Sequence, residues 1–393
     1  MDAGPDGRRG PSLVRLGIVM AEQSASAKLT GQRVLLLLVA ATVLWAVLSG
    51  LSRLGIALPL FAKSAVLHGP LFVLGVFQTV ISLERATALG RGWSYLAPLL
   101  GVLGTIASLF DLSVSLWLSS AATIVLTATN AVMVQRQAAA YTWLPLFAGL
   151  LLLLGNLRLL LGSPIFAVTS LWQSFFVLTI LAERLELSRL LKTPQWATRL
   201  LLLLSLGLSV SAFLAESHRS LAMPAFGVAM SLLALWQLRF DLARRTLRQQ
   251  RLPRLVAIGV LAGAGWLLVG GLLWLFGNIP FAGPRYDAAL HSVFVGYVLS
   301  MVVVHAPIIL PAVARVSLPY SPLLYLPLLV LHLSLVLRIM GDLAGLASLR
   351  LAGGIGNALT PPLLLLSVVL SARVSQTPKA RTPSDSPLLG VSQ

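Results

Sequence analysis

The sequence of 393 residues contains no cysteine. Without thiols the chain forms no disulfide, ligates no iron–sulfur cluster or thiolate-bound zinc, attaches no haem covalently and offers no cysteine nucleophile. Charged side chains are also scarce, at 10% of the chain, whereas a soluble protein carries about a quarter. With 57% hydrophobic residues and a mean hydropathy of +0.90, the composition excludes soluble, secreted and coiled-coil classes. We expect a polytopic membrane protein.

Long apolar runs account for most of the chain. A helix needs roughly 17–25 such residues to cross a hydrocarbon core of about 30 Å. The runs are continuous rather than alternating, which favours helices over barrel strands. We expect an all-α integral membrane protein of about twelve spans, at 33–55, 64–83, 95–110, 113–134, 142–161, 164–182, 198–215, 220–238, 254–277, 288–311, 321–339 and 351–371. The third run is short, and its boundary with the fourth falls near Asp111.

A short internal sequence repeat relates three of these spans. The second and sixth runs end in similar segments, Phe77–Arg85 and Phe176–Arg184, in which a Phe, an Ile and a Glu-Arg pair coincide. Leu67-His68 at the start of the second run is matched by Leu290-His291 in the tenth. Runs two, six and ten lie four apart, which predicts three four-helix arcs around a pseudo-threefold axis.

The net charge of +17 is best interpreted through the orientation of the chain in the membrane. With the N-terminus inside, 22 of the 29 lysines and arginines fall on one side of the membrane, and this asymmetry places both termini in the cytoplasm. We expect a bacterial inner (cytoplasmic) membrane protein whose main partner is the lipid bilayer. No soluble domain presents a basic patch, so nucleic acid is not an expected partner.

The two ends of the chain differ from the apolar remainder. Residues 1–30 and 374–393 are polar and rich in Ser, Pro and Gly, so we expect disordered cytoplasmic tails around a transmembrane domain at 31–373. The composition of residues 1–19 resembles that of untranslated sequence, so Met20 is an alternative start of translation.

Histidines inside the apolar runs are the first functional clue, because ionisable groups in a membrane are costly. His68 and His291 lie in the first turns of two runs with the same direction, so their side chains are expected at one depth near the outer face. Two neutral imidazoles from different helices at one depth are what axial ligation of a b-type haem requires. The alternative is that each histidine separately binds a carbonyl or a lipid headgroup.

His305 and His332 form a second candidate pair. His305 follows His291 by fourteen residues, which places both on one side of a helix about 21 Å apart. A second haem there would use His332 as the partner of His305, although their depths match poorly. His305 instead favours a hydrogen bond to backbone freed by Pro307.

Arginines near the outer ends of the spans are the second clue. Arg158 and Arg338 share the side of His68 and His291, and guanidinium groups match haem propionates well. Alternatively their long side chains reach the membrane interface, and Asp342 pairs with Arg338. We interpret Glu84-Arg85 and Glu183-Arg184 as interfacial ion pairs or lipid anchors.

The segment that begins with His68-Gly69 resembles the second helix of haem–copper oxidase catalytic subunits. That resemblance implies that His68 ligates a low-spin haem and that His291 fills the position of the opposite ligand. Twelve helices in three arcs is also that family's architecture. With Tyr286–His291 and His305-Ala306-Pro307, the chain looks most like the NnrS branch of nitric-oxide-response membrane proteins.

The departures from that family narrow the expected chemistry. Its copper site needs two adjacent histidines and a third on a preceding helix, whereas no two histidines are adjacent here. We therefore expect no copper and no proton-pumping oxygen reduction. The absence of cysteine excludes an iron–sulfur cluster, and no Walker loop or dinucleotide fingerprint occurs, so no nucleotide is expected. The hypothesis that remains is a haem b protein for electron transfer or for handling a small gaseous ligand such as nitric oxide, with a redox partner.

Two other classes remain open. A small-solute or lipid transporter or channel would have a polar cavity lined by Asn130, Asn156 and Gln173. It would also have a last span broken at Gly353–Asn357 and Pro361-Pro362. A purely structural membrane protein would have neither that cavity nor a close histidine pair.

Overall fold

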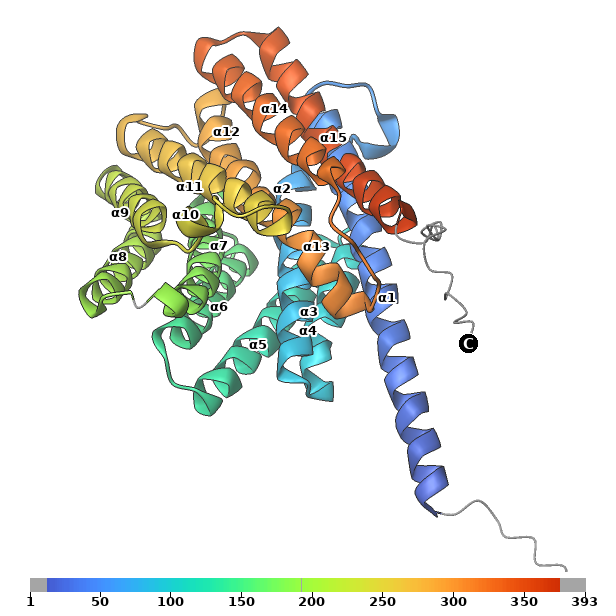
Figure 1. The fold of residues 1–393 in the computed structure, drawn as a ribbon. Helices are drawn as coiled ribbons and strands as arrows, with labels where there is room; N and C mark the ends of the chain where they lie inside the picture. The colour runs from blue at the N-terminus through green and yellow to red at the C-terminus, as the bar shows by residue number, and fades with distance from the viewer. Residues whose placement is uncertain (1–12, 192, 375–393) are drawn as a thin grey trace, which may run out of the picture.

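The computed structural model describes residues 13–191 and 193–374, which form an all-helical bundle (Figure 1). Among these residues, eleven helical segments are apolar and long enough to cross a membrane, and Gly92–Ala107 is a shorter apolar helix in place of the third predicted run. Asp111 caps the next helix, because its carboxylate accepts hydrogen bonds from the backbone of Ser113 at 2.7 Å and Val114 at 3.1 Å. The predicted all-α class is confirmed.

Most spans are single α-helices. These are α1 (Leu13–Arg53), α4 (Leu96–Ala107), α5 (Leu112–Arg136), α6 (Ala140–Leu160), α7 (Ile165–Ser188), α8 (Gln195–Leu214), α9 (Arg219–Phe240), α11 (Leu252–Phe276), α14 (Tyr325–Ala344) and α15 (Ala347–Val374). A short helix, α10 (Ala243–Thr246), lies between α9 and α11.

Two spans are composite, and each contains a π-helical segment. The first runs through α2 (His68–Pro70), the π-helical segment η3 (Leu71–Phe77) and α3 (Gln78–Leu89). The second runs through α12 (Pro284–His291), the π-helical segment η6 (Ser292–Leu299) and α13 (Ser300–Ala314). Wider π turns are rare and occur frequently at functional sites.

Helices that follow one another in the chain pack side by side. Contacts run from α3 through α4, α5, α6, α7, α8 and α9 to α11, and α15 packs on both α14 and α1. At the centre the rings of Phe77, Phe176 and Phe294 contact one another in sequence, with centroids 5.5 and 5.9 Å apart. These residues belong to the second, sixth and tenth predicted runs. The three runs that share the sequence repeat therefore contact one another. The α7 span is the most buried, with 89% of its apolar window inside the bundle.

The glycines of α11 permit close packing on two sides, as the small-residue spacing predicts. Gly259 faces Val304 of α13, and Gly263 faces the Met301 side chain. Gly271 instead faces the backbone of α9 at Gly227. A side chain at these positions would therefore push two helices apart.

Two predicted features differ from the structure. The residues from Gly353 to Pro362 lie within α15, which is an uninterrupted helix, so the expected break is absent. The long helix α1 begins at Leu13, so residues 13–30 are helical where a disordered tail was expected, and they extend α1 away from the bundle (Figure 1). Residues 1–12 and 375–393 of the predicted tails lie outside the described residues.

A matched pair of substitutions in α11 tests the close packing of α9 and α11. At Gly271 an added Cβ would lie 2.7 Å from the Ser231 backbone nitrogen, whereas at Gly265 nothing lies within 4 Å. We expect Gly271→Ala to lower the free energy of unfolding by about 1–3 kcal/mol, since backbone cannot move aside. Gly265→Ala should leave it nearly unchanged. Thermal unfolding in detergent, followed by tryptophan fluorescence, measures both; equal midpoints would contradict the packing.

Candidate functional site

The rings of His68 and His291 face each other across the start of the two composite spans. Their centroids are 6.1 Å apart and their planes differ by 11°. A centroid separation of this size lies within the range of about 4.5–7 Å for offset aromatic pairs, so the two imidazoles are direct neighbours. The structure therefore brings together the two histidines that the sequence analysis paired.

A π-helical segment follows each histidine within three residues. His291 is followed at once by η6, and η3 begins three residues after His68. Within the described residues these are the two π-helical segments, and both occur in the spans that carry the pair. The widened turns thus change the helical register between each imidazole and the centre of the bundle.

Hydrogen bonding fixes the protonation of His291. Its Nδ1 lies 2.8 Å from the carbonyl oxygen of Asp287, one turn earlier. A carbonyl only accepts, so Nδ1 carries the proton and, in the neutral ring, Nε2 keeps its lone pair. The ring of His68 lies against the Ala46 backbone of α1, although its buried Nδ1 does not reach hydrogen-bond geometry with any described residue. Both imidazoles can therefore offer a nitrogen lone pair to a metal.

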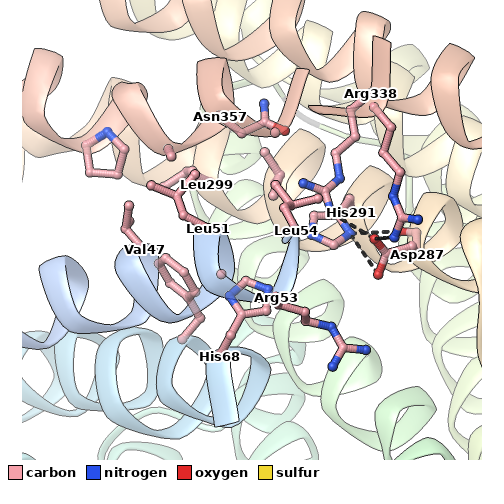
Figure 2. A pocket seen from close by; sticks show the side chains of 17 residues that line it. Val47, Leu51, Arg53, Leu54, His68, Asp287, His291, Leu299, Arg338 and Asn357 are labelled. Carbon is pink, nitrogen blue, oxygen red and sulfur yellow. Dashed lines mark hydrogen bonds and ion pairs between the residues drawn. The ribbon is translucent and has the colours of Figure 1, made fainter. Parts of the chain in front are cut away.

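A cluster of charges surrounds the carboxylate of Asp287 (Figure 2). Its Oδ2 accepts from Arg338 at 2.8 Å and from Arg350 at 3.1 Å. The Arg350 Nε also lies 3.0 Å from Asp342. Arg338 thus pairs mainly with Asp287 rather than with Asp342, which lies 4.0 Å away. The cluster thus contains two arginines and two aspartates, and Arg53 in the lining of both cavities adds a further positive charge.

Two cavities, of about 70 and 170 Å³, share His68 and His291 as walls. The smaller cavity lies against α1, α14 and α15 and includes Arg338 and Arg350 in its lining (Figure 2). The larger cavity lies against α7 and is mainly apolar, with Trp172 and several phenylalanines in its wall. Arg53 lines both. The pair is therefore flanked by one charged space and one apolar space.

Arg158 lies apart from this site. Its guanidinium is 3.2 Å from Glu216, donates to the carbonyl of Phe213 at 3.1 Å and stacks over the Phe213 ring. Arg158 lines neither of the two cavities. Of the two arginines predicted to accompany the histidines, the structure places only Arg338 beside them.

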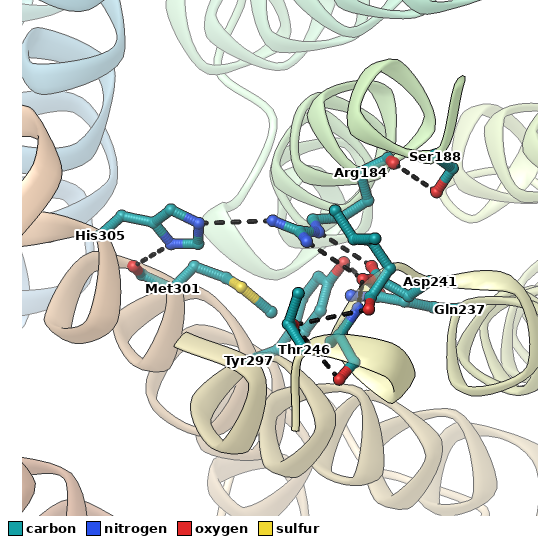
Figure 3. A network of polar contacts seen from close by, with 10 residues as sticks. Arg184, Ser188, Gln237, Asp241, Thr246, Tyr297, Met301 and His305 are labelled. Atoms are coloured by element: carbon teal, nitrogen blue, oxygen red, sulfur yellow. Dashed lines mark hydrogen bonds and ion pairs between the residues drawn. The ribbon is translucent and has the colours of Figure 1, made fainter. Parts of the chain in front are cut away.

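His305 and His332 belong to different surroundings and are not brought together as a pair. His305 Nδ1 donates to the Met301 carbonyl at 2.8 Å, and its Nε2 lies 3.4 Å from Arg184 (Figure 3). His332 Nδ1 accepts from Trp266 at 3.0 Å. The expected hydrogen bond of His305 to backbone is present, but its acceptor is Met301 rather than the carbonyl that Pro307 frees.

The network around His305 is built on a buried ion pair (Figure 3). Arg184 forms two hydrogen bonds to Asp241, at 2.8 and 3.0 Å, and the two side chains are 4% and 0% exposed. The neighbouring Glu183 pairs with Arg85 at 3.0 Å. Arg85, Glu183 and Arg184 of the two Glu-Arg pairs therefore make ion pairs between helices.

The polar residues expected in a transport cavity have protein partners instead. Asn130 donates to the Pro145 carbonyl at 3.1 Å, and Asn156 accepts from Trp172 at 3.3 Å. Gln173 accepts from Trp274 at 3.2 Å. None of these three amides lines either cavity beside the histidine pair.

Asp287 and Arg350 are the site residues that sequence reasoning missed. The signal for Asp287 was its position one turn before His291, where its carbonyl can accept from the imidazole. For Arg350 the sequence holds no comparable signal, since it reaches Asp287 from the start of a different helix, α15.

Comparison with known proteins gives a family. No curated protein and no solved structure matches the chain. A family model described as a domain of unknown function, DUF8744, matches residues 32–373 and so includes both composite spans and the whole candidate site. The chain is therefore a member of the DUF8744 family.

Proposed function

We propose that this protein binds one haem b between His68 and His291. The observation that carries the proposal is the parallel pair of imidazoles with centroids 6.1 Å apart. A metal ion bound about 2 Å from one nitrogen of each ring would separate the centroids by about 6 Å. The separation of the centroids is thus compatible with two imidazoles that would each turn an Nε2 edge towards one metal ion, because the lone pair lies in the plane of the ring.

The surroundings of the pair favour a porphyrin over a bare ion. Among the described residues, no three histidine, cysteine, aspartate or glutamate side chains are grouped to hold a metal ion. Two imidazoles complete a metal's coordination when a macrocycle supplies the other four ligands. The two adjoining cavities provide space on both sides of the axis between the rings.

The side chains of the two cavities would suit the propionates and the apolar macrocycle of a haem. Arg338, Arg350 and Arg53 line the smaller cavity, where they would pair with propionate carboxylates. Phe72, Phe77 and Phe294 line the larger cavity and would contact the apolar macrocycle. Asp287 would orient His291 through its carbonyl and hold the arginines through its carboxylate.

The bound haem would supply one-electron chemistry and affinity for small gaseous ligands. The protein would then act in electron transfer or in handling a ligand such as nitric oxide, with a redox partner. The aromatic cluster of Phe77, Phe176 and Phe294 would exclude water below the site. A relationship to NnrS-like proteins and an arrangement in three arcs around a pseudo-threefold axis belong to the same proposal.

The distribution of positive charge supports an orientation for this site. Both termini would lie in the cytoplasm of a bacterial cell, and His68 and His291 would lie near the outer face of the inner membrane. The network of Arg184, Asp241 and His305 would then lie towards the cytoplasm.

The haem proposal is tested by visible spectra of the protein purified in detergent from haem-supplemented cells. We expect a low-spin b-type spectrum and, by pyridine haemochrome, about one haem per chain. The low-spin spectrum should disappear in His68→Ala and in His291→Ala, because each change removes one axial nitrogen. It should persist in His218→Ala, a control in an exposed loop. A colourless wild-type protein, or an unchanged spectrum in both site variants, would refute the proposal.

The role of Arg338 is tested by potentiometry of the same preparation. A positive charge near the haem stabilises its reduced state. We therefore expect Arg338→Gln, which removes that charge, to lower the haem midpoint potential. The expected shift is on the order of 1–2 kcal/mol, or roughly 40–90 mV for one electron. Arg158→Gln is the matched control, because Arg158 pairs with Glu216 away from both cavities. Equal shifts in the two variants would show that the effect is not local.

A further inference from the structure

The connection between α9 and α11 concentrates positive charge at one end of the bundle. It includes six arginines, all of them exposed: Arg239, Arg244, Arg245, Arg248, Arg251 and Arg254. The helix α11 begins at this connection, and its other end leads to α12, which carries His291. The arginines and the histidine pair therefore lie at opposite ends of α11.

The protein supplies no free counter-charge within this connection. Between Glu216 and Asp287 the sequence contains one acidic residue, Asp241. Its fully buried carboxylate accepts two hydrogen bonds from Arg184 (Figure 3), and a third comes from the Ala243 backbone at 2.8 Å. Asp241 therefore anchors the start of the connection to the core and neutralises Arg184 rather than an exposed arginine.

The side chains of the exposed arginines have few contacts with the protein. Arg244 donates to the Arg239 carbonyl at 3.1 Å. Within the described part of the chain, the side chains of Arg245, Arg248 and Arg251 make no hydrogen bond or ion pair. A guanidinium group without a protein partner keeps its five N–H donors for an external anion.

Aromatic side chains beside the arginines indicate the depth of this connection in the membrane. The Phe240 ring lies 5.4 Å from that of Trp196 and 5.6 Å from that of Trp236. Trp196, in the first turn of α8, is 59% exposed, and Leu247 between the arginines is 39% exposed. Tryptophan at the end of an apolar span, next to basic side chains, is typical of the headgroup region. The connection therefore lies where lipid phosphates occur.

We propose that the connection from Arg239 to Arg254 binds the phosphate groups of anionic phospholipids in the leaflet at this end of the bundle. Guanidinium donors match phosphate oxygens, and the exposed Trp196 and Leu247 would contact the lipid chains. A soluble phosphate compound would use the charges alone. In the orientation proposed above this leaflet is the cytoplasmic one, and the site does not depend on haem.

Lipid binding to the full chain, purified in detergent and measured by native mass spectrometry, tests this inference. We expect phosphatidylglycerol to bind at least about tenfold more tightly than phosphatidylcholine, whose headgroup cation offsets the phosphate charge. The double variant Arg245→Gln/Arg248→Gln should lose most of this difference. Lys63→Gln/Arg285→Gln should keep it, although it also removes two exposed positive charges, because both residues lie at the histidine end of the bundle.

All four substituted side chains are exposed, so both double variants should unfold at the wild-type temperature in detergent. Equal affinity of the wild-type protein for the two lipids would overturn the proposal, and that arm needs no variant. An equal loss of lipid preference in the two double variants would overturn it as well. Tighter binding of glycerol phosphate or of a single-stranded oligonucleotide than of phosphatidylglycerol would instead assign the arginines to a soluble ligand.

Discussion

Every charged side chain that enters this bundle has to find its partner within the protein, because hydrocarbon offers neither hydrogen bonds nor counter-charges. Arg184 and Asp241 meet this requirement by pairing at almost complete burial. Asp287 meets it by accepting from two arginines that arrive on different helices. Removing one member of such a buried pair typically costs about 3–5 kcal/mol, since the other is left alone. These pairs therefore fix which helices lie together.

The candidate site depends on the same constraint. Asp287 interacts with two parts of the site. Its carbonyl accepts a hydrogen bond from His291, and its carboxylate binds Arg338 and Arg350. Changes in the packing of α14 or α15 would thus reach the imidazole through one residue. His68 instead lies against the Ala46 backbone of α1, and its Nδ1 is outside hydrogen-bond geometry. The asymmetry between the two histidines follows from the helices that surround each one rather than from the histidines themselves.

The His68–His291 pair shows how far sequence reasoning could reach. A shared Leu-His context and a shared position at the start of two spans were enough to predict one depth for both rings. Their separation and parallel planes come from the packing of the two composite spans, whose π-helical segments have no sequence pattern comparable to a helix period. Arg158 illustrates the limit: its depth suited the site, but its direction around α6 brings it to Glu216.

By itself the sequence determined the all-helical class and the approximate limits of the spans, because apolar length and the absence of charge are local properties. It also identified the histidines, since a costly residue stands out wherever it occurs in an apolar run. Only the tertiary structure decided which partners those residues have. Arg350 reaches Asp287 across 63 positions of the chain, and Gly50 of α1 faces His68 of the next span. Such contacts depend on how each helix is rotated and packed, which hydropathy does not encode.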